Sequence, residues 1–248
     1  MSILRTLLLA LLCVPAAGAE TLMERVLRSY DPVQSLCCEI RKDTENPAGA
    51  IRTLSRVYYQ RPDRLHVENV SPVKRRIVSD GTTFFSYIEG DPKGFSRPVA
   101  KLDREMLLQL RKVPGTAMDH LMRLAGAAAR PMDPTEEFPQ REGYDAENCF
   151  AVLSLDAVGR LARIEVFTAA DMKQKTAEYA YSAFKEAAPG VWIPCLHQVT
   201  AWTGGVETRE TSRIDNLAVN PPIAGALFIA EPFFRGVPFT ASFDEIYE

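Results

Sequence analysis

The sequence has none of the common catalytic signatures. It contains no Gly-x-Ser-x-Gly elbow, no phosphate-binding P-loop, no Cys-x-x-Cys pair and no His-Glu-x-x-His helix. Its three histidines, His66, His120 and His197, lie far apart along the chain and lack the spacing of metal ligands. The acidic pair Glu136 and Glu137 lies in a polar stretch of the sequence, and such a pair is ordinary in a solvent-exposed loop. We therefore expect no enzyme activity, no metal and no cofactor.

The chain also lacks a basic excess and a long apolar segment after its first residues. The formal net charge is −3, whereas a nucleic-acid-binding domain shows a clear positive excess, so we expect no nucleic-acid partner. No later segment approaches the roughly 20 apolar residues that a membrane-spanning helix needs. Apolar residues make up 46% and charged residues 25% of the chain, which is typical of a globular protein with a buried core.

The first 19 residues have the three parts of a secretory signal. Arg5 supplies the positive charge, residues 7–14 form a short apolar core, and residues 17–19 are small. This pattern predicts cleavage after Ala19 and a soluble mature protein in the periplasm. Cys13 follows the bulky Leu12, whereas a lipid-anchoring signal has a small residue before its cysteine, so we assign Cys13 to the discarded signal.

Four cysteines remain after cleavage: Cys37, Cys38, Cys149 and Cys195. An even number in an oxidising compartment permits disulfides. Cys37 and Cys38 are neighbours on a predicted strand, so their side chains point to opposite faces and do not pair with each other. A bridge between Cys149 and Cys195 is conceivable, and four buried free thiols are equally consistent with the sequence.

The spacing of apolar residues predicts one helix followed by strands. Leu22, Val26 and Tyr30 recur at helical spacing, and the helix should end before Pro32. The period then changes to two, and Asp80-Gly81 marks a hairpin turn between two of the strands that follow. The predicted strands of this half span residues 33–43, 51–60, 64–70, 74–79 and 82–88.

The middle of the chain predicts two short helices on either side of Pro114-Gly115. Apolar residues recur on one helical face over residues 102–110 and again over residues 118–125. Residues 131–143 are rich in Pro, Glu and Gly and should form a loop. Strands are then predicted at residues 148–155, 161–168, 175–184, 191–202 and 206–219. The tail from residue 221 should wrap irregularly and pack its aromatic side chains on the body: Phe228, Phe233, Phe234 and Phe239.

One segment carries a more specific pattern. It reads Val-Tyr-Tyr-Gln-Arg-Pro-Asp-Arg-Leu over residues 57–65 and Ile-Val-Ser-Asp-Gly-Thr-Thr-Phe-Phe-Ser-Tyr over residues 77–87. An Arg-Pro pair opening a strand, then a Ser-Asp-Gly turn and an aromatic strand ending in Tyr, resembles the periplasmic outer-membrane lipoprotein carrier family, the LolA type. The specific match covers about a third of the chain, and past residue 100 only the order of elements agrees.

The resemblance implies a mainly β (α+β) fold, an incomplete antiparallel β-barrel of about ten to eleven strands with short helices covering its mouth. Residues 20–248 would form a single LolA-like domain, acting as a monomeric carrier that shelters acyl chains. Its partners would be an acylated lipoprotein or lipid, an inner-membrane releasing complex and an outer-membrane acceptor. The motif arginine of the family holds the helical lid by hydrogen bonding, and by position it is Arg61. Leu65 replaces the family's aromatic residue, which keeps an apolar contact without a ring.

The carrier hypothesis predicts an apolar cavity between the strands and the helices. The strand residues expected to line it are Val57, Tyr59, Leu65, Val67, Phe85, Tyr87, Tyr179 and Tyr181. The helix residues expected to cover it are Leu107, Leu110, Leu121 and Met122. Two alternatives remain: a periplasmic regulatory or sensor module of the same fold that binds a membrane protein, and an enzyme, which would need clustered polar residues with shifted pKa values in a cleft.

Overall fold

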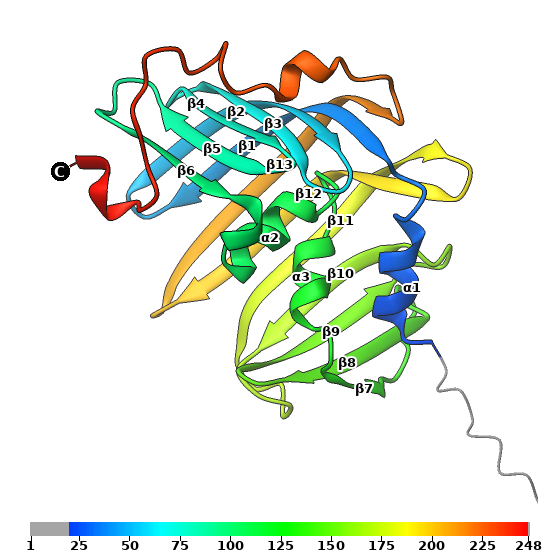
Figure 1. Ribbon diagram of the computed structural model, residues 1–248. Coiled ribbons are helices and arrows are strands. Elements are labelled where there is room, and N and C mark those ends of the chain that lie inside the picture. Colours follow the sequence, from blue (N-terminus) through cyan, green and yellow to red (C-terminus); the bar gives the residue numbers. More distant parts are fainter. Residues whose placement is uncertain (1–19, 248) are drawn as a thin grey trace, which may run out of the picture.

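The computed structural model describes residues 20–247, and their strands belong to one 14-stranded sheet (Figure 1). The predicted signal, residues 1–19, lies outside the described residues. The strands of the first half are β1 (Ser35–Asn46), β2 (Gly49–Gln60), β3 (Arg64–Ser71), β4 (Arg75–Asp80), β5 (Thr83–Ile88) and β6 (Gly94–Pro98). The later strands are β7 (Ala128–Pro131), β8 (Gln140–Ala146), β9 (Cys149–Leu155), β10 (Leu161–Phe167), β11 (Lys175–Ala188), β12 (Val191–Thr203), β13 (Val206–Val219) and β14 (Phe239–Thr240).

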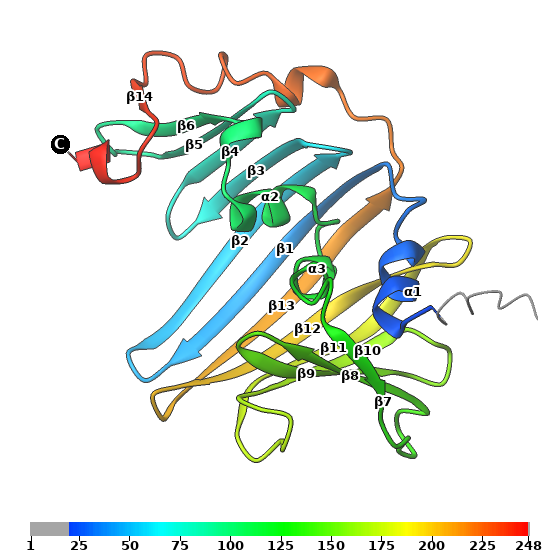
Figure 2. The same ribbon diagram turned by 60° about the horizontal axis from the view of Figure 1, so that its bottom comes forward.

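The sheet is two meanders joined in the middle. Apart from β14, which lies beside β6, each meander pairs strands that are neighbours in sequence, and β1 pairs with both β2 and β13, which links the two halves of the chain. Neighbouring strands are antiparallel, apart from the parallel pair β14 and β6. The sheet curls around the helices, and its end strands β14 and β7 do not pair with each other (Figure 2). The predicted mainly β, incomplete antiparallel barrel is therefore confirmed.

The structure has more strands than the sequence predicted. The additional ones are β6, β7, β8 and β14, of which β14 and β7 form the two open edges. The predicted bounds of the loop at residues 131–143 are wrong at both ends, because β7 ends at Pro131 and β8 begins at Gln140. Proline is tolerated at the end of an edge strand because it removes no ladder hydrogen bond there. A Cβ at Gly143 would overlap the ring of Phe150, so a glycine fits this paired position.

Within residues 20–247, three α-helices accompany the sheet: α1 (Leu22–Ser29), α2 (Arg104–Arg111) and α3 (Met118–Arg123). Three short 3-10 helices, Val99–Lys101, Gly225–Phe228 and Asp244–Tyr247, lie in the connecting segments and the tail. A capping box fixes the start of α1, where Thr21 and Glu24 bond each other's backbone and side-chain groups. Asp103 caps α2 by accepting a hydrogen bond from the Met106 amide at 2.8 Å. Both middle helices lie on the concave side of the sheet, as the sequence predicted (Figure 2). No described helix is long and apolar enough to cross a membrane.

The main core lies between the concave face and the three helices. Leu110 and Leu121 are almost completely buried there, together with strand residues such as Tyr59. The loop between α2 and α3 is buried as well, because Val113, Thr116 and Ala117 pack into the same cluster or directly beside it. Helices α2 and α3 are therefore packed into the core of the fold, and they also cover the concave face of the sheet.

The C-terminal tail packs on the body, as predicted. The Phe228 and Phe234 side chains are buried, and Phe239 lies in β14 against Gly94 of β6. Phe233 meets the ring of His66 edge-on at 4.7 Å. The tail runs over the upper strands in Figure 1, where it covers side chains of β5.

The four described cysteines are free. Cys38 is buried in the main core, and Cys37, Cys149 and Cys195 are half-buried. The bridge between Cys149 and Cys195 is not formed; the alternative of four buried free thiols agrees with the structure in that the thiols are free, but only Cys38 is buried.

Candidate functional site

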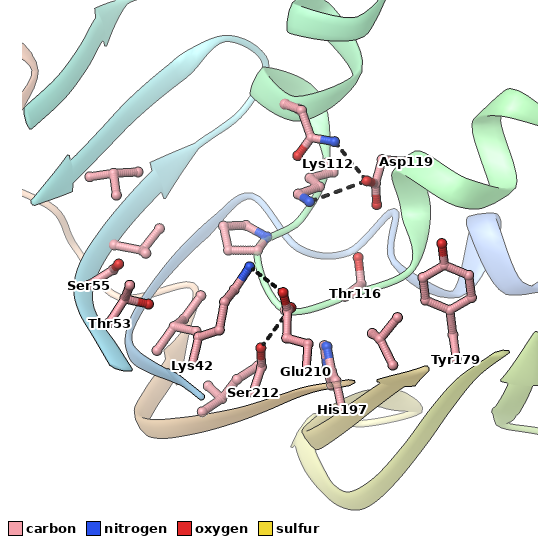
Figure 3. Close-up of a pocket in the computed structure, with 18 of the residues that line it drawn as sticks. Lys42, Thr53, Ser55, Lys112, Thr116, Asp119, Tyr179, His197, Glu210 and Ser212 are labelled. Atoms are coloured by element: carbon pink, nitrogen blue, oxygen red, sulfur yellow. Dashed lines mark hydrogen bonds and ion pairs between the residues drawn. The ribbon is translucent and has the colours of Figure 1, made fainter. Parts of the chain in front are cut away.

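A cavity of about 520 Å³ lies between the concave face of the sheet and the α2–α3 segment. Its floor comes from strands of both halves of the chain, and residues 114–116 and the flanking ends of α2 and α3 form its roof (Figure 3). A volume of this size is typical of pockets that bury a small molecule. The cavity therefore exists in the folded chain without any movement of the roof.

One wall of the cavity is apolar. Val57, Val67 and Ile77 come from the neighbouring strands β2, β3 and β4 and pair with one another across the sheet. Ile40 and Ile214 form a second pair on β1 and β13. Side chains of a strand alternate between faces, so these residues all point to the concave side.

Five of the strand residues expected at the site line this cavity: Val57, Leu65, Val67, Tyr179 and Tyr181. Tyr59 points to the same side but lies deeper, and only 1% of it is exposed. Its hydroxyl donates a hydrogen bond to the carbonyl oxygen of Arg111 at 3.1 Å, so it supports the end of α2.

Phe85 and Tyr87 lie on the opposite face of the sheet, which corrects their expected placement. Phe85 packs against Phe234 and Phe239 of the tail. Tyr87 lines a separate depression of about 400 Å³ together with Phe234. The neighbouring Phe84 is the residue that faces the core. Because β5 carries aromatic residues at adjacent positions, alternation alone did not reveal which of them point inward.

The apolar helix residues also need a correction. Leu110 and Leu121 are buried in the core, and Leu107 and Met122 pack against it, so none of the four lines the cavity. The helical segment presents a polar flank to the cavity instead: Gln109 of α2, Lys112 directly after α2, and Asp119 and His120 of α3. The sequence analysis missed these four because an apolar stripe is the same signal for a core helix and for a cover.

Asp119 is the centre of the polar network in the roof. It accepts a hydrogen bond from Gln109 Nε2 at 2.8 Å and lies 3.3 Å from Lys112 Nζ. Arg123 is a more distant partner at 3.6 Å. Burial opposes ionisation of this carboxyl, but the charge of Lys112 and its other neighbours outweighs burial and lowers the pKa of Asp119. The network therefore ties α2 to α3 with an ionised carboxylate.

A second ion pair lies on the floor. Lys42 Nζ of β1 is 3.0 Å from the Glu210 carboxylate of β13, and Ser212 donates to the same carboxylate (Figure 3). Thr53 and Ser55 of β2 add hydroxyl groups beside it. The cavity is therefore apolar on one side and carries charged and hydroxyl groups on the other.

Two histidines line the cavity next to the inward tyrosines. The ring of His120 lies 4.3 Å from that of Tyr179, and the ring of His197 lies 5.0 Å from that of Tyr181. Burial lowers the pKa of His120 and of His197, which keeps both rings neutral near pH 7. Among residues 20–247, the hydrogen-bonding contacts of these rings are those of His120 with Arg123 at 3.4 Å and of His197 with the carbonyl oxygen of Pro194 at 3.1 Å.

Arg61 is hydrogen bonded to the end of α1, and among the described residues it has no direct hydrogen bond to α2 or α3. Its Nη2 donates to the carbonyl oxygen of Tyr30 at 3.0 Å, at the C-terminal end of α1. Asp31 lies 3.9 Å from Nη1. The lid contact expected of Arg61 is made by another residue of the same motif, Asp63, which pairs with Arg111 of α2.

Comparison with solved structures identifies the fold. A LolA superfamily protein from Nitrosomonas europaea is 10% identical, with a TM-score of 0.50 over 84% of this chain and 96% of that one. An outer membrane lipoprotein-sorting protein domain from Vibrio parahaemolyticus is 9% identical, with a TM-score of 0.53 over 85% of this chain and 98% of that one. The chain has the LolA-type fold.

A third solved structure has a similar fold. A DUF1329 family protein from Desulfovibrio piger is 11% identical, with a TM-score of 0.56 over 85% of this chain and 95% of that one. No family model and no curated protein matches the sequence. At these sequence identities, the likeness to LolA-type structures shows a shared fold and nothing more. A shared fold does not identify the ligand, which has to be argued from the cavity itself.

Proposed function

We propose that the mature chain is a periplasmic carrier that shelters the acyl chains of lipoproteins, or of another lipid, in the cavity during transfer to the outer membrane. The observation that carries this proposal is the open space of about 520 Å³ beside the apolar wall of Val57, Val67 and Ile77. A cavity filled by the chain's own side chains would have argued against it. The LolA-type fold supports the proposal.

The energetics favour such a site for an acyl chain. Moving one methylene group out of water contributes about 0.8 kcal/mol, so a free acyl chain partitions into a membrane or aggregates unless a protein covers it. The roof over the cavity consists of two short helices, α2 and α3, joined by residues 112–117. Opening this roof for loading would expose core residues such as Leu110 and Leu121, and it would also break the polar contacts of Asp119.

The same proposal covers the location and organisation of the protein. Residues 1–19 would direct export and be removed after Ala19, and residues 20–248 would act as one domain. An inner-membrane releasing complex would load the carrier and an outer-membrane acceptor would unload it. The proposed role is one of binding, for which the apolar wall of the cavity provides the surface.

Native mass spectrometry of the mature chain purified from a periplasm tests the proposal. We expect an added mass that lipid extraction identifies as an acylated molecule. Val67→Asp should abolish it by placing a charge in the apolar wall. Val158→Asp is the matched control, because Val158 lies in a turn and is 68% exposed. Thermal unfolding of both variants checks that they fold.

A bare mass and no uptake of an added diacylated peptide would contradict the carrier function. Recovery of one membrane protein in a stable complex without lipid would favour a regulatory or sensor module instead. A carrier should keep its lipid when the membrane protein is absent, so the two readings give different masses from the same preparation.

A further inference from the structure

A row of polar residues crosses the cavity floor from β2 to β11. The strand ladders pair Thr53 with Lys42, Lys42 with Ser212, Ser212 with His197, and His197 with Tyr181. All five residues line the cavity, and the first four can be followed across Figure 3. We call these five residues the polar row.

The next position on one side of the row, two residues along the strands on the same face, is largely apolar. It contains Ile40 and Ile214, which pair with each other and line the cavity. Ser55 pairs with Ile40, but its hydroxyl is already bonded to the side-chain oxygen of Asn69 at 2.8 Å. The apolar wall begins at Val57, the following inward position of β2. A hydrocarbon chain on these residues is therefore bordered by the polar row.

The charges in the cavity lining cancel one another. Two cations and two carboxylates line the cavity, and they form two ion pairs: Lys42 with Glu210 at 3.0 Å and Lys112 with Asp119 at 3.3 Å. An ionised ligand group would have to break one of these pairs or remain unpaired, and an unpaired charge is costly in a partly buried site. The cavity is therefore suited to a polar group that carries no charge.

Tyr181 supplies an unused hydrogen-bond donor at the end of the polar row. Only 6% of this residue is exposed, and its ring lies 5.0 Å from that of His197. Among the described residues its hydroxyl makes no hydrogen bond, and the hydroxyl oxygen is not sealed off from the cavity. Burial raises the pKa of Tyr181, so the hydroxyl keeps its proton at neutral pH. Because buried polar groups normally have a partner, this donor points to an acceptor inside the cavity.

Tyr179 lies two residues before Tyr181 on the same face of β11. Its hydroxyl also has no hydrogen bond among the described residues, but the residue is half-buried, so water reaches it more readily. Tyr59, another tyrosine of the concave side, differs because the carbonyl oxygen of Arg111 already accepts its hydroxyl. The Tyr181 hydroxyl is therefore the buried donor that a ligand in the cavity can satisfy.

We propose that the cavity binds the acyl group of an ester or an amide, with the carbonyl oxygen accepting a hydrogen bond from Tyr181 and the hydrocarbon lying on Ile40, Ile214 and the apolar wall. This inference rests on the proposed carrier function and narrows its cargo to molecules whose acyl chain is joined through an uncharged carbonyl. A chain without an acceptor displaces water from the Tyr181 hydroxyl and leaves it unpaired, which a buried site penalises. Tyr181 therefore determines the specificity of the cavity.

Calorimetric titration of the mature chain, with each probe below its aggregation concentration, tests this. The probes are 1-dodecanoylglycerol, the ether 1-O-dodecylglycerol, N-dodecanoylethanolamine and ionised dodecanoate. The first two differ only in the carbonyl group. We expect the ester to bind roughly tenfold more tightly than the ether, as one satisfied buried donor provides, and more tightly than dodecanoate. The tighter binder of the ester and the amide assigns the linkage that the cavity prefers.

Substitutions separate the carbonyl contact from general effects. Tyr181→Phe removes the hydroxyl and keeps the ring, so it should bring the affinity for the ester to within a factor of about two of that for the ether. Binding of the ether should not weaken, which also shows that the variant is folded. Tyr87→Phe is the matched control, because Tyr87 lines the depression on the opposite face of the sheet and should keep the full preference. Tyr179→Phe should keep most of it.

Three results would overturn the inference while the carrier function stands: equal affinity for the ester and the ether, tighter binding of dodecanoate than of the ester and the amide, or a preference for the ester that survives Tyr181→Phe. Failure of every probe to bind would remove the carrier function itself. The two failures are therefore distinct in one set of titrations.

Discussion

Arg111 and Asp63 form a two-pronged ion pair that joins α2 to the turn between β2 and β3. Arg111 Nε lies 2.7 Å and Nη2 3.2 Å from the two carboxylate oxygens of Asp63. The same residue is held from its backbone, where its carbonyl oxygen accepts the Tyr59 hydroxyl. Arg111 is the last residue of α2. These contacts therefore fix the C-terminal end of α2, where the helix leads into the roof loop of the cavity.

Asp63→Asn should loosen this end of α2. The substitution removes the charge but keeps the shape, so the loss reports the ion pair. Arg111 is 48% exposed and water weakens the pair, so we expect about 1 kcal/mol less stability in urea unfolding. Hydrogen exchange should rise in the amides of α2 before those of the strands. Asp171→Asn, at the exposed pair with Lys173, serves as the control and should change neither quantity.

Gly115→Ala should destabilise the roof loop for two reasons. Gly115 has φ +79°, which favours glycine, and an added Cβ would overlap the end of the Ile214 side chain in the cavity floor. Gly190→Ala separates the two causes, because Gly190 has φ +74° but open space around it. We expect a loss of about 1 kcal/mol for Gly190→Ala and a clearly larger one for Gly115→Ala in urea unfolding. Equal losses would show that the contact with Ile214 adjusts freely.

The strands of the fold were predictable where they are buried on one face, because alternation is then strong. In this way β3 came out within a residue of its observed bounds, whereas β9, which is buried on both faces, was predicted as an apolar run that ends at a turn. The missed strands lie at or near the edges, where pairing needs few apolar side chains. Gly94 illustrates the reason: β6 needs a glycine there because the Phe239 ring occupies the space of a Cβ, and in the sequence that glycine indicates a loop.

The cavity was predictable in part, for the same physical reason. Val57 and Val67 have polar neighbours on each side, so their inward direction follows from alternation. Phe85 could not be separated from Phe84, since both are aromatic and each face of β5 is covered, one by the core and one by the tail. Lys112 and Asp119 line the cavity because of the orientation of the helical segment over the sheet. An apolar stripe predicts that orientation only after the surface against which the helix packs is known.

Acidification should destabilise the protein through the two half-buried histidines of the cavity, His120 and His197. Burial lowers the folded-state pKa of His120 and His197 below the unfolded value of about 6.5, so the unfolded chain binds more protons as the pH falls below that value. The stability from keeping these rings neutral is present above pH 6.5 and is lost towards the lower folded pKa. Between pH 6.5 and 5.5 each histidine contributes a loss of at most about 1.4 kcal/mol.

Urea unfolding at pH 7.5 and 5.5 measures this loss directly. The variant His120→Gln with His197→Gln should show a smaller difference between the two pH values than the unchanged protein. Lys112 and Arg123 already oppose a further positive charge on His120, and Asp119 partly offsets them. A pH difference that is the same in both proteins would place the titrating groups elsewhere, with His66 the next to test because burial lowers its pKa as well.

The thiols should be free but slow to react in the folded protein. Burial raises the pKa of Cys38 to about 12, and it also raises the pKa of Cys149 and of Cys195. Only the thiolate is nucleophilic, so at pH 8 about one Cys38 side chain in ten thousand is reactive at any moment. Iodoacetamide followed by mass spectrometry should leave Cys38 unmodified in buffer and alkylate four cysteines in urea without a reductant. Alkylation of two only would demonstrate a disulfide, whereas five would show that the leader with Cys13 is still attached.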